Sequence, residues 1–225
     1  MYTGTDNLEA MQLATNYNAY LVKMVLDAVA TDGTVLDFGA GTGTFARHVR
    51  DAGHRVVCVE PDPELRSRLA AAGFEVHPDI AGVPAESVDC AFTLNVLEHI
   101  EDDREAVREL YRVLKPGGSL FVYVPAMRML WTSMDTKVGH FRRYEASTLS
   151  ALLRGASFDV RNVRYVDSLG VAITLLYKLV GSRRGDLNIP VLKLYDRVFF
   201  PLSVFLDRFV GSVMGKNALA VARRY

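Results

Sequence analysis

The fold is decided by one stretch, Val35-Leu36-Asp37-Phe38-Gly39-Ala40-Gly41-Thr42-Gly43. Its first residues are apolar, with β-branched and aromatic side chains, which favours a buried strand. An acid and three alternate glycines follow, and residues 44–49 then have helical character. Glycine permits positive φ angles and lets a ligand approach the backbone closely. The stretch therefore predicts a strand, a tight turn and a helix, with a ligand against the turn.

The acid in this stretch indicates the kind of ligand. The carboxylate of Asp37 at the end of the predicted strand favours a ligand with positive charge or hydrogen-bond donors. A phosphate-binding P-loop is excluded, because no Gly-Lys-Ser/Thr sequence follows the glycines. The spacing over residues 41–46 also fits G-x-G-x-x-A, so the alternative class is an NAD(P)-dependent oxidoreductase in which Glu60 binds the ribose.

Four motifs follow one another over residues 35–125. After the glycine-rich stretch comes a second strand at residues 55–60 that ends in an acid, then a fourth strand and loop at 87–100, and then a helix-to-strand turn at 110–118 containing Lys-Pro-Gly-Gly. In this order they resemble the class I S-adenosylmethionine-dependent methyltransferases of the small-molecule type. The resemblance implies an α/β fold: a Rossmann-like, doubly wound, seven-stranded sheet, mostly parallel, with an antiparallel last strand.

The resemblance also implies the cofactor, S-adenosylmethionine, and the residues that hold it. Glu60 would bind the two ribose hydroxyls, Asp79 the adenine amino group, and Asn95 or the backbone near it the methionine part. For Tyr17 the alternative is an ordinary core-facing aromatic. The expected cofactor-binding set is Tyr17, Asp37, Gly39, Ala40, Gly41, Glu60, Pro61, Asp79, Ile80, Asn95 and Val96.

The length of 225 residues suits one domain. Residues 1–33 are expected to form a leading helix over the cofactor, 34–125 the cofactor-binding core, and 126–225 the acceptor-binding part. Within the last part, residues from about 168 to 214 predict a helical insertion, kinked by Pro201, with more apolar residues than one helix pair can bury by itself. We interpret it as a lid over a lipophilic acceptor. Contact within a homodimer and contact with a membrane surface are the alternatives.

The charges are divided between the two halves of the chain. Residues 1–125 hold 10 Lys/Arg and 19 Asp/Glu, whereas residues 126–225 hold 16 and 7. A basic acceptor half suits an anionic acceptor. Residues 135–144 concentrate this charge, and they resemble the Gly-His-x-Arg-Arg-Tyr segment of a subgroup of bacterial methyltransferases. We interpret one set of residues as an anion clamp: Lys137, His140, Arg142, Arg143 and Tyr144. Alternatively, both arginines pair with acids such as Glu145 or cap the following helix.

The candidate catalytic residues are His140, Tyr144 and Glu98. His140 is the first candidate base, because an unperturbed imidazole titrates near neutral pH. Tyr123 and His99 are further candidates. The spacing of His, Asp and Glu predicts no dedicated metal site, so a magnesium-dependent mechanism is not expected.

These features predict a methyltransferase for a small, anionic and lipophilic acceptor, through carbon methylation of a prenyl diphosphate or oxygen methylation of a lipid or sugar. The alternative acceptor is a neutral phenolic natural product of bacterial secondary metabolism. No aromatic-interleaved basic module indicates nucleic acid. Cys58 and Cys90 lie in predicted strands and are expected to be buried thiols. The sequence shows no signal segment, and the expected location is cytoplasmic.

Overall fold

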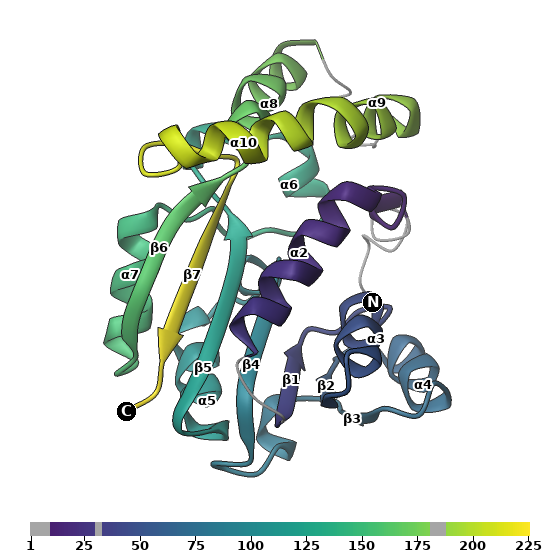
Figure 1. The fold of residues 1–225 in the computed structure, drawn as a ribbon, viewed down its shortest axis with the longest axis vertical. Coiled ribbons are helices and arrows are strands. Elements are labelled where there is room, and N and C mark those ends of the chain that lie inside the picture. Colours follow the sequence, from purple (N-terminus) through teal and green to yellow (C-terminus); the bar gives the residue numbers. More distant parts are fainter. Residues whose placement is uncertain (1–9, 30–32, 181–187) are drawn as a thin grey trace.

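The protein folds around one seven-stranded sheet with the strand order β3-β2-β1-β4-β5-β7-β6, shown in Figure 1. This computed structural model describes residues 10–29, 33–180 and 188–225. Strand β7 is antiparallel to both of its neighbours, and the pairs β1–β2, β1–β4, β2–β3 and β4–β5 are parallel. The predicted fold class is confirmed. The strands are β1 (Thr34–Phe38), β2 (Arg55–Val59), β3 (Glu75–His77), β4 (Val88–Leu94), β5 (Leu114–Pro125), β6 (Asp159–Val166) and β7 (Asn217–Arg223).

Helices cover both faces of the sheet because the buried strands present apolar side chains on both sides. In β1, Val35 packs in the cluster that contains helix α2 and α3 residues, whereas Leu36 and Phe38 pack in the cluster of α5 and α7. The parallel strands end at one common edge, where the turns that follow them meet. The covering helices are α2 (Thr15–Ala28), α3 (Thr44–Asp51), α4 (Pro63–Ala71), α5 (Asp103–Val113) and α7 (Ala146–Gly155).

The predicted insertion lies between β6 and β7 and crosses the carboxyl edge of the sheet (Figure 1). It comprises α8 (Ser168–Val180), α9 (Ile189–Leu194), a π-helical segment η4 (Tyr195–Phe199) and α10 (Phe200–Val210). Pro201 lies in the first turn of α10, where a missing N–H is tolerated, and the irregularity precedes it as the π-helical segment. Residues 181–187 of the expected insertion, and residues 1–9 and 30–32 of the expected leading helix, lie outside the described residues.

Short helices occupy the loops at the carboxyl edge. They are η1 (Ile80–Gly82), η2 (Leu97–His99), η3 (Arg128–Leu130) and α6 (Ser133–Lys137). Cys58 and Cys90 are buried free thiols, as predicted. No helix among the described residues has the length and apolar character needed to cross a membrane.

Candidate active site at the carboxyl edge of the sheet

The glycine turn after β1 brings two loops into contact. Gly39, Gly41 and Gly43 all have positive φ angles, of 84°, 54° and 76°. A Cβ atom on Gly39 would lie 2.3 Å from Cγ2 of Val96, which follows β4. Position 39 therefore needs glycine for its backbone conformation and for the close approach of the two loops.

Two acids lie beside this turn at the ends of adjacent strands. Asp37 is only 3% exposed, and its Oδ2 has no hydrogen-bond partner in the described part of the chain. Burial, together with the charge of Glu60, raises the pKa of Asp37 to about 8. Glu60 accepts hydrogen bonds from the backbone N–H groups of Gly41 (2.7 Å) and Asp62 (2.9 Å). A buried carboxylate with one unpaired oxygen, beside an open glycine turn, suits a cationic ligand with hydroxyl groups, such as S-adenosylmethionine.

The expected adenine contacts lie further along the same edge. Asp79 is exposed, and its Oδ1 accepts a hydrogen bond from the backbone N–H of Gly82 at 3.3 Å. Ile80 packs, partly buried, against the core, and Pro61 is exposed. Asp79 therefore caps a short helix in this structure, and its contact with adenine stays a prediction.

Tyr17 of α2 reaches the loop after β4. Asn95 has a positive φ of 54°, and its amide nitrogen lies 3.5 Å from the Tyr17 hydroxyl. The rings of Tyr17 and Tyr123 pack edge to face with centroids 6.1 Å apart. Burial raises the pKa of Tyr17 to about 12 and that of Tyr123 well above its ordinary value. Tyr123 therefore stays protonated and does not serve as a base, and contact of Tyr17 and Asn95 with the cofactor stays a prediction.

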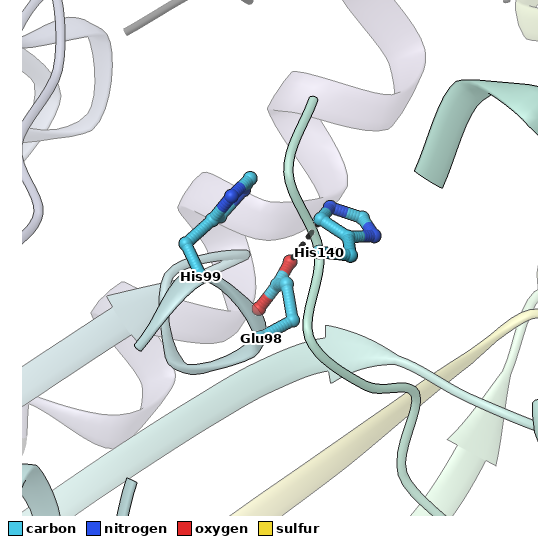
Figure 2. Close-up of side chains that lie close together, drawn as sticks. All are labelled: Glu98, His99 and His140. Atoms are coloured by element: carbon cyan, nitrogen blue, oxygen red, sulfur yellow. Dashed lines mark ion pairs between the residues drawn. The ribbon is translucent and has the colours of Figure 1, made fainter. Parts of the chain in front are cut away.

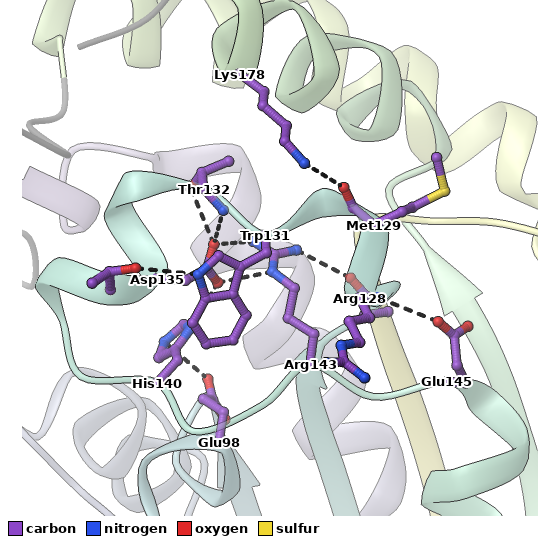
Figure 3. Close-up of polar contacts among 12 residues, drawn as sticks. Glu98, Arg128, Met129, Trp131, Thr132, Asp135, His140, Arg143, Glu145 and Lys178 are labelled. Atoms are coloured by element: carbon purple, nitrogen blue, oxygen red, sulfur yellow. Dashed lines mark hydrogen bonds and ion pairs between the residues drawn. The ribbon is translucent and has the colours of Figure 1, made fainter. Parts of the chain in front are cut away.

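A second cluster of polar residues surrounds His140, as Figure 3 shows. Its Nδ1 lies 2.8 Å from Oδ1 of Asp135, which is 1% exposed. Arg143 donates to both carboxylate oxygens, at 2.8 and 3.1 Å, and the backbone N–H of Thr132 donates at 2.7 Å. Burial alone would raise the pKa of Asp135, but the hydrogen bonds from His140 and Arg143 hold it well below its usual range. Asp135 therefore fixes the orientation of the His140 ring.

Glu98 and His99 lie on the other side of His140 (Figure 2). Glu98 is fully buried, neither of its carboxylate oxygens has a hydrogen-bond partner among the described residues, and Oε1 lies 3.9 Å from Nε2 of His140. Burial raises the pKa of Glu98 to about 8. The rings of His99 and His140 pack edge to face at 4.6 Å, and burial together with His140 lowers the pKa of His99 to about 4. The sequence predicted no set of metal ligands, yet these three side chains each place one donor atom within 4.8 Å of the others.

Two further residues of the expected anion clamp, Arg142 and Tyr144, have partners within the protein. Arg142 pairs with Asp103 at 2.8 Å, and the Tyr144 hydroxyl donates to the same carboxylate at 2.8 Å. Burial and Asp103 raise the pKa of Tyr144 far above its ordinary value. Lys137 is the last residue of α6. The alternative of paired arginines is therefore the one observed, with Asp103 and Asp135 as partners in place of Glu145, and Tyr144 has the contacts of a structural residue.

Several hydrogen bonds join the insertion to this edge. Asp196 accepts hydrogen bonds from the backbone N–H groups of Asn16 (3.0 Å) and Tyr17 (2.8 Å). Lys178 donates to the backbone carbonyl of Met129 at 3.1 Å, as Figure 3 shows. The insertion also exposes many apolar side chains: Leu176, Ile189, Val191, Leu194, Val198, Phe199, Leu202, Phe205 and Phe209.

Sequence reasoning missed Asp103, Asp135 and Asp196 as organising residues. One signal was present: Thr132-x-x-Asp135 has the spacing of a capping box, and the structure forms that box. Two grooves lie elsewhere. One runs between α2 and α3 past Gln12 and His48, and the other is at the opposite end of the sheet near Asp89. Neither groove is lined by Asp37, Glu60, Glu98 or His140.

The seven-stranded sheet, with an acid at the carboxyl end of each of the first two strands, is typical of the class I methyltransferases. Comparisons with known proteins agree. A family model described as a methyltransferase domain matches residues 12–163. The chain therefore belongs to the class I S-adenosylmethionine-dependent methyltransferases. Membership supports the predicted cofactor and disfavours the dinucleotide oxidoreductase. The finer resemblance, to a subgroup with a Gly-His-x-Arg-Arg-Tyr segment, stays a prediction.

Individual relatives agree with this family. A Mycolicibacterium smegmatis protein described as a probable S-adenosylmethionine-dependent methyltransferase is 33% identical over 61% of this chain and 54% of its own length. A malonyl-acyl-carrier-protein O-methyltransferase of Enterobacter lignolyticus is 30% identical over 66% of this chain and 68% of its own. The crystal structure of a methyltransferase from Thermotoga maritima, 19% identical, superposes with a TM-score of 0.66 over 99% of this chain and 97% of its own. The chain spans about half the length of the first of these relatives.

Proposed function

We propose that this chain transfers the methyl group of S-adenosylmethionine to a hydroxyl oxygen of a neutral, apolar small molecule, with His140 as the proton acceptor. The observation that carries the proposal is the pair His140–Asp135. Their 2.8 Å contact holds the imidazole in one orientation at the carboxyl edge of the sheet, and its other nitrogen, Nε2, faces the loop that follows β4. Ligands of doubly wound sheets bind at this edge.

The cofactor half of the proposal rests on the first group of residues. Asp37 and the turn Gly39–Gly41 would hold the cationic part of the cofactor, Glu60 its ribose, Asp79 its adenine and Asn95 its methionine end. The unpaired Oδ2 of Asp37 supports this placement, because a cation would stabilise the buried charged form of this carboxylate. When bound, S-adenosylmethionine supplies an electrophilic methyl group.

The transfer is an in-line displacement, so the protein acts by alignment and by removing one proton. The acceptor oxygen forms a bond to the methyl carbon while the carbon–sulfur bond breaks and its electron pair stays on sulfur. Nε2 of His140 takes the hydroxyl proton. The imidazolium that results is stabilised by the carboxylate of Asp135, which Arg143 and Thr132 hold in place.

The character of the acceptor follows from what surrounds His140. Trp131 packs edge to face with the His140 ring at 6.5 Å, and Phe141, the next residue in the chain, is more than half exposed. Arg142 and Arg143, which an anionic acceptor would need, already pair with Asp103 and Asp135. The geometry therefore favours the neutral phenolic acceptor over the anionic one. The relative named as a malonyl-acyl-carrier-protein O-methyltransferase agrees with this proposal in the methylated element, oxygen, and not in the neutral acceptor.

The test is a thermal-shift panel in saturating S-adenosylhomocysteine. Ligands that bind only the native state raise its melting temperature by mass action. We expect a further shift with neutral phenols, and mass spectrometry with S-adenosylmethionine should then detect the methylated oxygen. A shift with prenyl diphosphates or lipid-like carboxylates alone would contradict the neutral acceptor. A double variant Arg142→Glu/Arg143→Glu that keeps its fold and loses only those anionic ligands would contradict it as well.

A further inference from the structure

Three potential ligands converge beside the proposed acceptor site. Glu98 and His99 belong to η2, directly after β4, and His140 belongs to the loop that follows α6. The backbone N–H of Phe141 donates to the Glu98 carbonyl at 2.8 Å and holds the two loops together. One ligand atom from each of the three side chains lies within 4.8 Å of the other two (Figure 2).

The carboxylate in this group lacks a partner that would compensate its burial. Glu98 is 0% exposed, and neither of its oxygens has a hydrogen-bond partner among the described residues. Buried carboxylates are normally paired with a cation or bound to a metal, because burial of an isolated charge is strongly unfavourable. The nearest imidazole nitrogen, Nε2 of His140, lies 3.9 Å away, which is too far for a hydrogen bond.

Both histidines have outer partners of the kind that metal-binding histidines use. Nδ1 of His140 contacts Asp135 at 2.8 Å, which leaves Nε2 directed towards Glu98. The ring of His99 is hydrogen-bonded to the backbone of Val138. Metal-ligating histidines usually donate their second N–H to a carboxylate or a backbone carbonyl, which fixes the tautomer and the ring orientation. Asp135 is itself fixed by Arg143 and Thr132.

We propose that Glu98, His99 and His140 bind one divalent transition-metal ion. Two imidazoles and one carboxylate suit zinc, iron, cobalt, nickel or manganese better than magnesium or calcium, which prefer oxygen ligands alone. Tetrahedral metal–ligand bonds of about 2.1 Å place ligand atoms about 3.4 Å apart, so ligand atoms now within 4.8 Å of one another would approach by up to about 1.4 Å around the ion.

Three protein ligands leave open positions on the ion, which is the pattern of catalytic metal sites. The role in catalysis rests on the proposed function. An acceptor hydroxyl at an open position would lose its proton more readily, because a bound metal lowers the pKa of oxygen ligands. With an ion bound, Nε2 of His140 would be a ligand, and the ion would replace it as the group that promotes loss of the acceptor proton; without the ion, His140 stays the base of the proposed function. Binding of the ion by itself can be measured without acceptor or cofactor.

The experiment uses the full chain without a histidine tag, stripped with a chelator and then dialysed. Cobalt is titrated and followed by its visible absorption bands, which report the ligand set, and zinc is titrated by calorimetry. We expect one ion per chain, and about tenfold or greater loss of affinity in each of Glu98→Gln, His99→Gln and His140→Gln. The matched control is His48→Gln, which changes an exposed histidine of α3 and should bind as the wild type does.

The fold of each variant is checked by circular dichroism and by its S-adenosylhomocysteine affinity. Glu98→Gln keeps the shape of the side chain, so a folded variant that retains wild-type cobalt spectra and affinity would overturn the inference. So would wild-type protein that gives no cobalt bands and no zinc heat while it still binds S-adenosylhomocysteine. Wild-type protein that binds cobalt but methylates none of the phenols counts instead against the proposed function.

Discussion

Oδ1 of Asp196 accepts a hydrogen bond from the backbone N–H of Tyr17 at 2.8 Å, although the two residues lie 179 positions apart in the chain. The residue at the N-cap of α2 is Ala14, which has no side-chain oxygen to offer. Asp196 takes over that role from the insertion, and it also accepts from the backbone N–H of Asn16 at 3.0 Å. The start of the helix expected over the cofactor is thus held by the helical insertion.

Replacement of Asp196 by Ala should lower the free energy of unfolding by about 1–3 kcal/mol, because two backbone N–H groups lose their acceptor. Chemical denaturation measures this loss, and hydrogen exchange should quicken at the first turn of α2. The control is Asp27→Ala, which removes only an exposed ion pair with Lys23 and should change stability by less than about 1 kcal/mol. Equal effects of the two substitutions would contradict the remote cap.

Cofactor affinity should depend on pH through Asp37. Its pKa of about 8 lies above the ordinary 3.8, so the folded protein without ligand binds this proton more tightly than the unfolded chain does. The associated stability is fully present below about pH 4 and is lost as the pH rises towards 8. Affinity for cationic S-adenosylmethionine should change in the opposite direction and rise over this range, because the cation selects the ionised carboxylate.

Asp37→Asn tests this assignment by calorimetry. The amide carries no charge, so the variant should bind S-adenosylmethionine about tenfold or more weakly at pH 8. A tenfold loss corresponds to a shift of one unit in the pKa of Asp37 when the cofactor binds. Its affinity should vary less with pH than that of the wild type, while the ligand-free variant should melt at a higher temperature at pH 8. An unchanged pH dependence would show that Asp37 does not face the cofactor.

Gly39→Ala should weaken cofactor binding, and Gly53→Ala is its matched control. Both positions have positive φ angles, of 84° and 98°, so both variants acquire backbone strain of about 1–3 kcal/mol. Only at Gly39 does the added Cβ meet another loop, 2.3 Å from Cγ2 of Val96, whereas at Gly53 nothing lies within 4 Å. Calorimetry with S-adenosylhomocysteine should therefore show a loss of affinity in the first variant alone. Partial recovery in Gly39→Ala/Val96→Ala would confirm the clash as the cause.

The Asp135–His140 pair should control turnover more than binding. Once a phenolic acceptor is identified, His140→Gln should lower kcat about 10²-fold or more, in the range of general-base catalysis. Asp135→Asn should lower kcat in the same direction, because the amide cannot stabilise the imidazolium. The pair is not expected to contact S-adenosylhomocysteine. Affinity for this ligand should therefore stay within about twofold of the wild-type value, because substitutions at sites without shared contacts have independent effects. Unchanged kcat in both variants would rule out His140 as the base.

Much of the fold could be predicted because each strand carries a local signal. The apolar runs at residues 56–59 of β2 and 120–124 of β5 are continuous, as buried parallel strands require, and the motifs between the strands indicated a doubly wound, mostly parallel sheet through the resemblance. The irregularity in the insertion was expected at Pro201 and lies just before it, since proline fits the first turn of a helix without a break.

The site could be predicted only in part, because its partners come from distant segments. Arg142 and Arg143 were correctly seen as a cationic cluster, but their charge alone did not show that Asp103 and Asp135 already neutralise them. In the same way Glu98 and His140 lie 42 positions apart in the sequence and meet only because the two loops share the carboxyl edge of the sheet. Such contacts depend on tertiary structure and leave no local pattern.

The two buried thiols give this protein an intrinsic reporter of its own unfolding rate. Cys58 lies inside β2 and Cys90 inside β4, and burial raises the pKa of Cys90 to about 11 and that of Cys58 further. Neither sulfur is a nucleophile in the native sheet, because alkylating reagents attack the thiolate. Iodoacetamide labelling counted by mass spectrometry therefore follows the opening of two central strands, without any engineered label.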